Sequence, residues 1–411
     1  MDDVEGPGAR PELAELFSRS RRADPYPGYA QLRESAPVWE PFPGLLVLSR
    51  HADCVRVLRD LRFGHLDERA VRRGRRGSGP GAVVDADRGL VRSFLMRDPP
   101  DHTRLRRLVA RSFTPRRVEG LAPRIEALAG ELLGRSGGRS SFDVIAGLAS
   151  PLPVAVISEL LGVPEKDRPR LVVWSHALAR GLDPAFLVTT EERQAQLSAR
   201  DELAAYLVEE IGRRRRSPGD DLVSDLVAMH DRGEPLSEAE LVATCTLLLV
   251  AGHETTTSLI GNAVHALAQN PDQLDVLSRE PSLLPAVVEE VLRFDSPVQL
   301  TGRVALEDAE AGGVSTPRGT FLVLLIAAAN RDPLAFDAPD RFDVRRASSS
   351  HLAFGQGIHF CLGAPLARLE AQIALRALVG AFGTFRLASE PRWKDNAVLR
   401  GLARLEMEVG R

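Results

Sequence analysis

Residues 354–363 read Phe-Gly-Gln-Gly-Ile-His-Phe-Cys-Leu-Gly, a segment in which glycines surround a single cysteine. Gly355 and Gly357 permit backbone angles that other residues avoid, so the chain before Cys361 can fold tightly against something flat. Pro365 then begins a helical pattern, which places the Cys361 sulfur near a helix N-terminus. There the helix dipole and free N–H groups favour thiolate over thiol. Two interpretations follow, a thiolate ligand for iron or a buried structural cysteine.

A long helical pattern at residues 236–269 contains a second unusual segment. Ser237 and Glu240 form a capping-box pattern at its start. The pattern is apolar on most faces as far as Ala251, as expected of a helix buried at the centre of a protein. It then turns polar, with the sequence Gly-His-Glu-Thr-Thr-Thr at 252–257. A buried carboxylate is costly unless paired, and Gly and Thr weaken a helix, so we expect a functional, locally distorted segment here. The alternative is a capping threonine beside an exposed glutamate.

Helical periodicity dominates the rest of the chain. Apolar residues recur at three- and four-residue spacings over 104–113, 123–133, 193–216, 284–294 and 364–379. Strand-like runs beside Gly or Pro turns occur at 45–49, 301–305 and 321–328. There is no internal repeat and no long linker. The sequence therefore predicts a mainly α protein with a small β-sheet, folded as a single domain of residues 1–411.

The composition is that of a folded, water-soluble protein. Of the 411 residues, 44% are hydrophobic and 27% are charged, and the formal net charge is −3, so nothing argues for nucleic acid or a membrane surface as a partner. No signal peptide is evident, and the longest apolar stretch, 321–329, is far shorter than the roughly 20 residues that cross a bilayer. A few scattered cysteines make no disulfide framework, so Cys54 and Cys245 are expected to be core residues of a cytoplasmic protein.

The pattern Phe-Gly-x-Gly-x-His-x-Cys-x-Gly at 354–363 resembles the haem-binding signature of the cytochrome P-450 family. The resemblance implies the fold of that family, in which the haem (heme b) lies between the long central helix and the Cys-bearing loop. It implies that Cys361 is the axial iron ligand and that its thiolate promotes cleavage of dioxygen. By the same resemblance Phe354 covers the sulfur and His359 contacts a haem propionate.

Two further groups of residues extend the resemblance. His102 and Arg106, four residues apart on one helical face, resemble the propionate-binding pair of the family, and Arg303 in Thr-Gly-Arg resembles a third propionate contact. Each alone would be taken for a surface charge, but together they supply cations for two carboxylates. The pattern Glu-x-x-Arg at 290–293 and the segment Pro-Asp-Arg-Phe at 339–342 resemble a structural network behind the haem, in which the arginine of the second segment, Arg341, is the third member.

The polar segment of the central helix resembles the family signature Ala-Gly-x-acid-Thr. An acid beside an alcohol can relay protons, so we expect Glu254 to take protons from solvent and Thr255 to hold the water that delivers them. His253 and His265 have no partner at ligand spacing and are expected to be ordinary. Leu248, Ala251 and Gly252 share a helical face with Thr255 and are expected to line a mostly apolar substrate pocket. By the resemblance, Val298, Gln299 and Val398 line the same pocket.

The resemblance implies a haem-thiolate monooxygenase that inserts one oxygen atom into a hydrophobic small molecule, by hydroxylation or epoxidation in polyketide-like secondary-metabolite tailoring. Electrons are expected from NAD(P)H through a ferredoxin and its reductase, docking at Arg104, Arg107, Arg111, Arg116 and Arg117. The alternatives are oxidative coupling, a peroxide-driven haem enzyme and a non-enzymatic haem binder. A basic segment lies at the expected substrate entrance and consists of Arg69, Arg72, Arg73, Arg75 and Arg76. It would suit an anionic substrate or an acidic carrier protein. The alternative is a solvated loop with no binding role.

Overall fold

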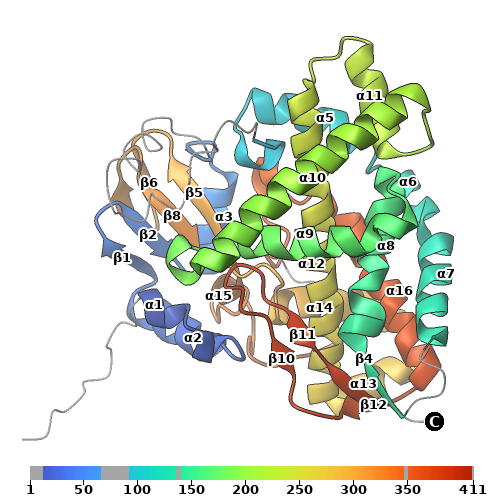
Figure 1. Cartoon of the computed structure of the whole chain (residues 1–411). Coiled ribbons are helices and arrows are strands. Elements are labelled where there is room, and N and C mark those ends of the chain that lie inside the picture. The colour runs from blue at the N-terminus through green and yellow to red at the C-terminus, as the bar shows by residue number, and fades with distance from the viewer. Residues whose placement is uncertain (1–12, 66–91, 136–139, 347–349, 410–411) are drawn as a thin grey trace, which may run out of the picture.

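A computed structural model describes residues 13–65, 92–135, 140–346 and 350–409 (Figure 1). The α-helices are α1 (Leu13–Leu16), α2 (Tyr26–Ser35), α3 (His51–Arg59), α5 (Asp101–Ala110), α6 (Pro115–Gly120), α7 (Ala122–Gly134), α8 (Pro151–Leu161), α9 (Arg168–Arg180), α10 (Thr190–Arg216), α11 (Leu222–Asp231), α12 (Glu238–Gln269), α13 (Pro271–Arg279), α14 (Leu284–Phe294), α15 (Ile326–Ala329) and α16 (Ala364–Phe382). A π-helix, η4 (Ile145–Ala149), precedes α8, and the short 3-10 helices are η1 (Arg19–Arg21), η3 (Phe94–Met96), η5 (Glu165–Asp167), η6 (Ala185–Leu187), η7 (Pro281–Leu283) and η8 (Gly357–His359).

The strands form several small sheets, the largest of which lies to one side of the helices, in agreement with the predicted fold class (Figure 1). The largest sheet has five strands in the order β1-β2-β8-β5-β3, and its β2–β8 pair is parallel. The strands are β1 (Val38–Phe42), β2 (Leu45–Leu48), β3 (Phe63–Gly64), β4 (Ser141–Asp143), β5 (Thr301–Ala305), β6 (Ala309–Ala311), β7 (Val314–Thr316), β8 (Phe321–Leu324), β9 (Phe385–Leu387), β10 (Arg392–Trp393), β11 (Leu402–Arg404) and β12 (Glu406–Val409).

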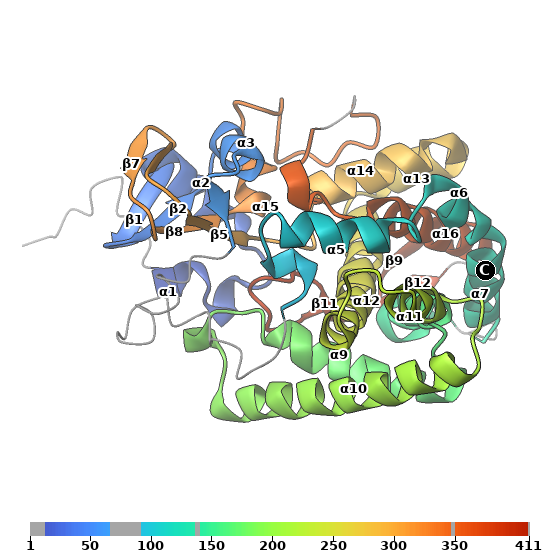
Figure 2. The same ribbon diagram turned by 90° about the horizontal axis from the view of Figure 1, so that it is seen from above.

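Helix α12 runs through the centre of the molecule, as the sequence predicts. Ser237 caps it: its hydroxyl accepts a hydrogen bond from the Glu240 N–H, and the Glu240 carboxylate accepts one from the Ser237 N–H, so the capping box is confirmed. Seen from above, α12 lies between α10 on one side and α14 on the other (Figure 2). The helix is unbroken through 252–257, from Glu238 to Gln269. The Thr255 hydroxyl donates to the Ala251 carbonyl at 2.6 Å without breaking the helix.

The structure differs from the sequence-based prediction in the end of one strand and in several helices. The run predicted as one strand over 321–328 ends at Leu324, and its alanines form α15 instead, because alanine has the highest helix propensity. The helical periodicity does not predict α1, α2, α3, α6, α8, α9, α11 or α13. Helix α8 is buried over almost its whole length, so its apolar residues surround it and leave no one-sided periodicity to detect.

No helix of the described residues is long and apolar enough to cross a membrane. Cys54 and Cys245 are fully buried, as expected of core residues, and burial raises the pKa of both thiols, that of Cys245 to about 12. The folding of residues 1–411 as a single domain stays a prediction.

Candidate active site

The segment around Cys361 is a tight loop that enters the N-terminus of α16. The Cys361 N–H donates to the Phe354 carbonyl at 2.9 Å, which closes the loop. Gly355 and Gly357 have φ angles of 68° and 69°, in the left-handed region that favours glycine. A Cβ on Gly357 would lie 2.3 Å from the carbonyl oxygen of Leu58 on α3, so the loop packs against α3 too closely for any larger residue.

The Phe354 ring is held from behind the loop by a charged group. The Arg368 guanidinium carbon lies 4.5 Å from the centre of this ring, and Arg368 donates two hydrogen bonds to Glu289, at 2.6 and 2.8 Å. His351 lies 3.1 Å from the same carboxylate. Burial alone would raise the pKa of Glu289, but the Arg368 and His351 hydrogen bonds lower it to about 2. The carboxylate is therefore ionised and holds both side chains in place.

Burial raises the pKa of the Cys361 thiol. The N–H groups of Gly363 and Ala364 and the charge of Arg106 act in the opposite direction but do not outweigh burial. This corrects the expectation that the helix N-terminus alone would favour thiolate, because removing an anionic sulfur from water costs more than two N–H groups supply. A coordinating metal ion deprotonates a thiol outright, so iron bound at Cys361 would favour the thiolate.

The predicted propionate-binding residues come together from distant parts of the chain. The ring centres of His102 and His359 are 4.3 Å apart, and a histidine that the sequence analysis missed, His65, lies 4.7 Å from His359. Both nitrogens of His102 and His359, and Nε2 of His65, are buried without a hydrogen-bond partner among the described residues. Buried polar atoms in proteins normally have a hydrogen-bond partner, so a group of histidine nitrogens without one indicates that a ligand binds here.

Two arginines add positive charge to this cluster. Arg303 is 4% exposed, and its guanidinium donates to the neighbouring Thr301 hydroxyl and Gly302 carbonyl, with no ion pair to any described residue. Burial lowers the pKa of Arg303 to about 10, an effect that Asp98 partly offsets. Arg106 donates to the Phe360 carbonyl at 2.5 Å, beside Cys361. The two arginines and the histidine nitrogens that lack a hydrogen-bond partner among the described residues lie next to the cysteine loop. Together they fit the two carboxylates of a haem. His102, Arg106, Arg303 and His359 would hold these carboxylates, with His65 beside them.

Replacing Arg303 by alanine is expected to weaken haem retention by about 10- to 100-fold, because a buried hydrogen bond to a charged group contributes about 1.5–3 kcal/mol. The rate of haem transfer to excess apomyoglobin measures this effect. Arg392→Ala, on the exposed strand β10, is the matched control and should leave the rate unchanged. Equal rates for wild type and Arg303→Ala would contradict the propionate role.

A buried ionic network lies behind the loop, but one of its members differs from the prediction. Glu290 and Arg293 are 2% and 0% exposed and form two hydrogen bonds of 2.8 Å. The third side chain is that of Arg346, which donates to both Glu290 oxygens at 3.1 and 3.0 Å. Arg341, predicted for this position, is exposed and contributes its carbonyl oxygen to Arg293. The chain turns between 341 and 346, so the sequence motif alone does not tell which arginine points inward.

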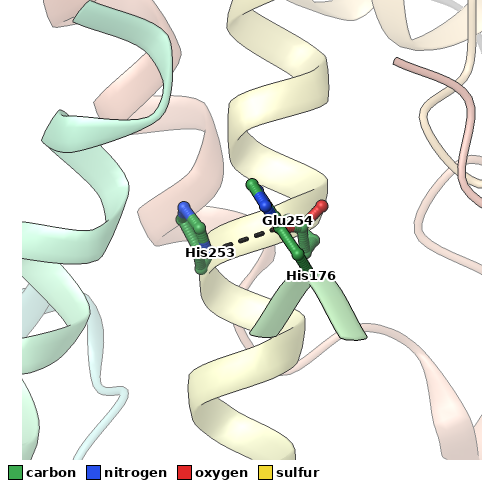
Figure 3. Close-up of side chains that lie close together, drawn as sticks. All are labelled: His176, His253 and Glu254. Atoms are coloured by element: carbon green, nitrogen blue, oxygen red, sulfur yellow. Dashed lines mark ion pairs between the residues drawn. The ribbon is translucent and has the colours of Figure 1, made fainter. Parts of the chain in front are cut away.

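Glu254 and Thr255, the predicted relay pair, point to different surroundings. Glu254 is 3% exposed; its Oε2 accepts a hydrogen bond from Lys394 at 2.9 Å, and its Oε1 lies 3.0 Å from Nε2 of His176 on α9 (Figure 3). Burial would raise the pKa of Glu254, but His176 and Lys394 lower it to about 2. The Thr255 side chain is instead partly open and bonded to Ala251. Of the two side chains that pair with Glu254, His176 is 49% exposed and Lys394 is 13% exposed.

The expectation that His253 lacks partners at ligand spacing is wrong. His253, His176 and Glu254 bring their ligand atoms within 4.8 Å of one another, which makes them the one potential metal-binding cluster among the described residues. His176 lies on a different helix, so spacing along the sequence could not reveal this cluster. His265 packs edge-on against Trp393, with ring centres 5.2 Å apart, and is an ordinary packed side chain.

The predicted pocket residues fall into three groups. Ala251 is exposed on α12 and Leu248 is buried one turn before it. Gly252 faces away from them, because a Cβ there would meet Ile157 of α8 at 3.2 Å. Val298, Gln299 and Val398 do adjoin, through a bridge from Val298 to Leu399 and a 2.9 Å hydrogen bond from the Gln299 N–H to the Val398 carbonyl. The Gln299 side chain is buried: its oxygen accepts a hydrogen bond from the Tyr29 hydroxyl and its amide N–H donates to the Ser296 carbonyl, which leaves one N–H and one lone pair of the amide unused by these two bonds.

The mainly helical fold, the cysteine loop and the buried histidines without hydrogen-bond partners beside it fit the class of haem enzymes. The sequence profile of cytochrome P-450 matches residues 78–401. The 6-deoxyerythronolide B hydroxylase of Saccharopolyspora erythraea is 40% identical over 97% of this chain and 99% of its own. The polyketide biosynthesis cytochrome P-450 PksS of Bacillus subtilis is 37% identical over 96% of this chain and 95% of its own.

Solved structures agree with these relatives. The ligand-free crystal structure of Mycobacterium smegmatis CYP164A2 matches with a TM-score of 0.89 and 45% identity, over 98% of this chain and all of that chain (100%). P450BioI in complex with hexadec-9Z-enoic acid ligated acyl carrier protein matches with a TM-score of 0.84 and 36% identity, over 95% and 100%. The chain belongs to the cytochrome P-450 family and is a monooxygenase that uses haem and dioxygen.

Proposed function

We propose that this monooxygenase hydroxylates or epoxidises a hydrophobic small molecule in secondary-metabolite tailoring. The observation that carries the proposal is the likeness over nearly the whole chain to a 6-deoxyerythronolide B hydroxylase and to a polyketide biosynthesis enzyme. The apolar side chains of Leu248, Val298 and Val398 suit such a substrate. Haem bound at Cys361 supplies the redox-active iron at which dioxygen is activated.

The chain's own residues then have separate tasks. Cys361 binds the iron, while Phe354 with Arg368 behind it keeps the loop in place. His102, Arg106, Arg303 and His359 orient the haem through its carboxylates. Thr255 positions a water molecule with its hydroxyl. Glu254 is ionised and buried, so it accepts a proton from the His176 side and must turn away from Lys394 to pass the proton toward Thr255.

Thr255→Ala is expected to uncouple electron use from product formation. Productive turnover should fall by about 100-fold, the lower end of what a positioned proton donor contributes, while hydrogen peroxide release rises. Product and peroxide formed per NAD(P)H consumed measure the effect. Thr256→Ala is the matched control, since the neighbouring threonine is buried on another face of α12. Full coupling in Thr255→Ala would remove Thr255 from the relay.

A panel of macrolactones, steroids and fatty acids tests the substrate class. A ligand of the correct class should shift the haem spectrum on binding and give a product that carries one ¹⁸O atom from ¹⁸O₂. A product without ¹⁸O would favour oxidative coupling, and turnover with peroxide but not with reduced ferredoxin would favour a peroxide-driven enzyme. The absence of any turnover with bound ligands would favour a non-enzymatic haem binder.

Electrons are proposed to come from NAD(P)H through a ferredoxin and its reductase. The expected docking surface is smaller than the sequence suggested, because Arg104, Arg111 and Arg117 form ion pairs with Glu240, Glu234 and Asp225. Arg107 and Arg116 are exposed and form no ion pair with a described residue. A reduction rate that does not depend on salt concentration would contradict an electrostatic docking surface.

An acidic carrier protein remains a second candidate partner, supported by the likeness to P450BioI, which was crystallised with an acyl carrier protein. The basic segment that suggested it, Arg69 to Arg76, lies outside the described residues. Charge reversal of these arginines tests the proposal, because carrier-bound substrate should then bind more weakly while the free substrate is unaffected.

A further inference from the structure

Three metal-binding side chains meet at the junction of α9 and α12, where Figure 3 shows them pointing toward one another. Nε2 of His176 lies 3.0 Å from Oε1 of Glu254, and Nδ1 of His253 lies 3.5 Å from the same oxygen. The two imidazoles are stacked, with ring centres 5.7 Å apart and an angle of 16° between their planes. Donor atoms at such separations can share one metal ion, since each would lie about 2.0–2.2 Å from it.

The cluster contains a buried ligand atom that has no hydrogen-bond partner among the described residues. His253 is 0% exposed, yet its Nδ1 makes no hydrogen bond to a described residue, and neither does Oε1 of Glu254. The other nitrogen, Nε2, lies 3.3 Å from the Ser150 hydroxyl, which fixes the ring orientation. Metal-binding histidines typically use one nitrogen for the ion and the other for such a hydrogen bond.

The types of side chain also suit a metal ion. Zinc binds imidazole nitrogens and carboxylate oxygens, and two histidines with one glutamate are a frequent ligand set for this ion.

We propose that His176, His253 and Glu254 form a binding site for a divalent transition metal ion of the zinc type. The exposed side of His176 gives the ion a path from solvent and leaves a coordination position for water. Occupation of the site would hold the Glu254 carboxylate and so inhibit turnover. This inhibition, unlike the binding itself, rests on the proposed role of Glu254 in proton delivery.

Lys394 opposes metal binding, so a change at this residue is expected to change the affinity of the site for zinc. Its ammonium group lies 2.9 Å from Oε2 of Glu254, so it compensates the carboxylate and repels a second cation. Lys394→Met removes the repulsion without removing a ligand. Zinc affinity should therefore rise several-fold in Lys394→Met, whereas a site that did not include Glu254 would be insensitive to this change.

The binding test is calorimetric titration of the haem-loaded ferric protein with ZnCl₂. We expect one zinc ion per chain. Loss of a residue that only hydrogen-bonds to a metal ligand typically weakens metal binding by about 10- to 100-fold. His176→Ala removes a ligand itself and should weaken zinc binding by more than this. His176 is half exposed, so this variant should fold. His230→Ala, a histidine on α11 outside the cluster, is the control and should bind zinc like wild type. Absence of binding, or equal binding by His176→Ala, would overturn the site.

The inhibition is tested separately by turnover with and without zinc. Product formed per NAD(P)H should fall in wild type as zinc occupies the site, and His176→Ala should be resistant at the same zinc concentration. If zinc binds in a His176-dependent manner but turnover is unaffected, the metal site stands and the role of Glu254 in proton delivery fails. The two parts of the proposal are therefore distinguishable.

Discussion

Cys361→Ala is expected to abolish the red-shifted absorption band that carbon monoxide gives with the reduced, haem-loaded protein, and to abolish turnover. The band reports a thiolate ligand opposite carbon monoxide, and the push of electron density from that thiolate is what promotes dioxygen cleavage in this family. Cys361 is the cysteine that the loop holds at the start of α16, next to Arg106 and the orphaned histidines. Absorption spectra of the reduced protein with carbon monoxide provide the measurement.

The other cysteines supply the controls for this experiment. Cys54 and Cys245 are fully buried in the hydrophobic core, so neither should contribute to the band. Cys54→Ala and Cys245→Ala should keep it, with at most a small loss of stability. A band that persists in Cys361→Ala and disappears in one of these variants would show that the assignment of the iron ligand is wrong.

Local sequence patterns predicted the elements whose causes are themselves local. The capping box at Ser237 fixes the start of α12, and the turns before and after Thr301–Ala305 fix the ends of β5. The glycines of the cysteine loop have the left-handed angles that their positions imply. Each of these features depends on residues within a few positions, so a single sequence is enough to place it.

Features that depend on long-range packing were missed or misplaced. His176 meets Glu254 from another helix, Lys394 reaches the same carboxylate from near the C-terminus, and His65 joins His359 across most of the chain. The pKa of Cys361 was misjudged for a related reason, since burial is a property of the whole fold and outweighs the local helix N-terminus.

Arg293→Ala is expected to destabilise the protein by about 3–5 kcal/mol, the cost of leaving one partner of a buried ion pair without compensation. Arg293 has no exposed surface and also donates to the carbonyls of Asn330, Pro339 and Arg341, so its loss leaves Glu290 and these oxygens short of donors. Arg279→Ala is the matched control, because its pair with Asp275 on α13 is exposed and should contribute about 0–1 kcal/mol. Guanidinium unfolding of the haem-loaded protein gives both values.

If Arg293→Ala does not fold, a second variant, Arg293→Lys, tests the same pair. It keeps the charge but loses the paired hydrogen bonds, so it should unfold at a lower denaturant concentration than wild type.

The same measurement decides which arginine completes the network. Arg346→Ala removes two hydrogen bonds to the buried Glu290 carboxylate and should cost about 1.5–3 kcal/mol. Arg341→Ala removes an exposed side chain and should change stability by less than about 0.5 kcal/mol, since its carbonyl remains in place. The resemblance to the family favoured Arg341, whereas the fold favours Arg346. A larger loss for Arg341→Ala than for Arg346→Ala would reverse the assignment and restore the motif-based one.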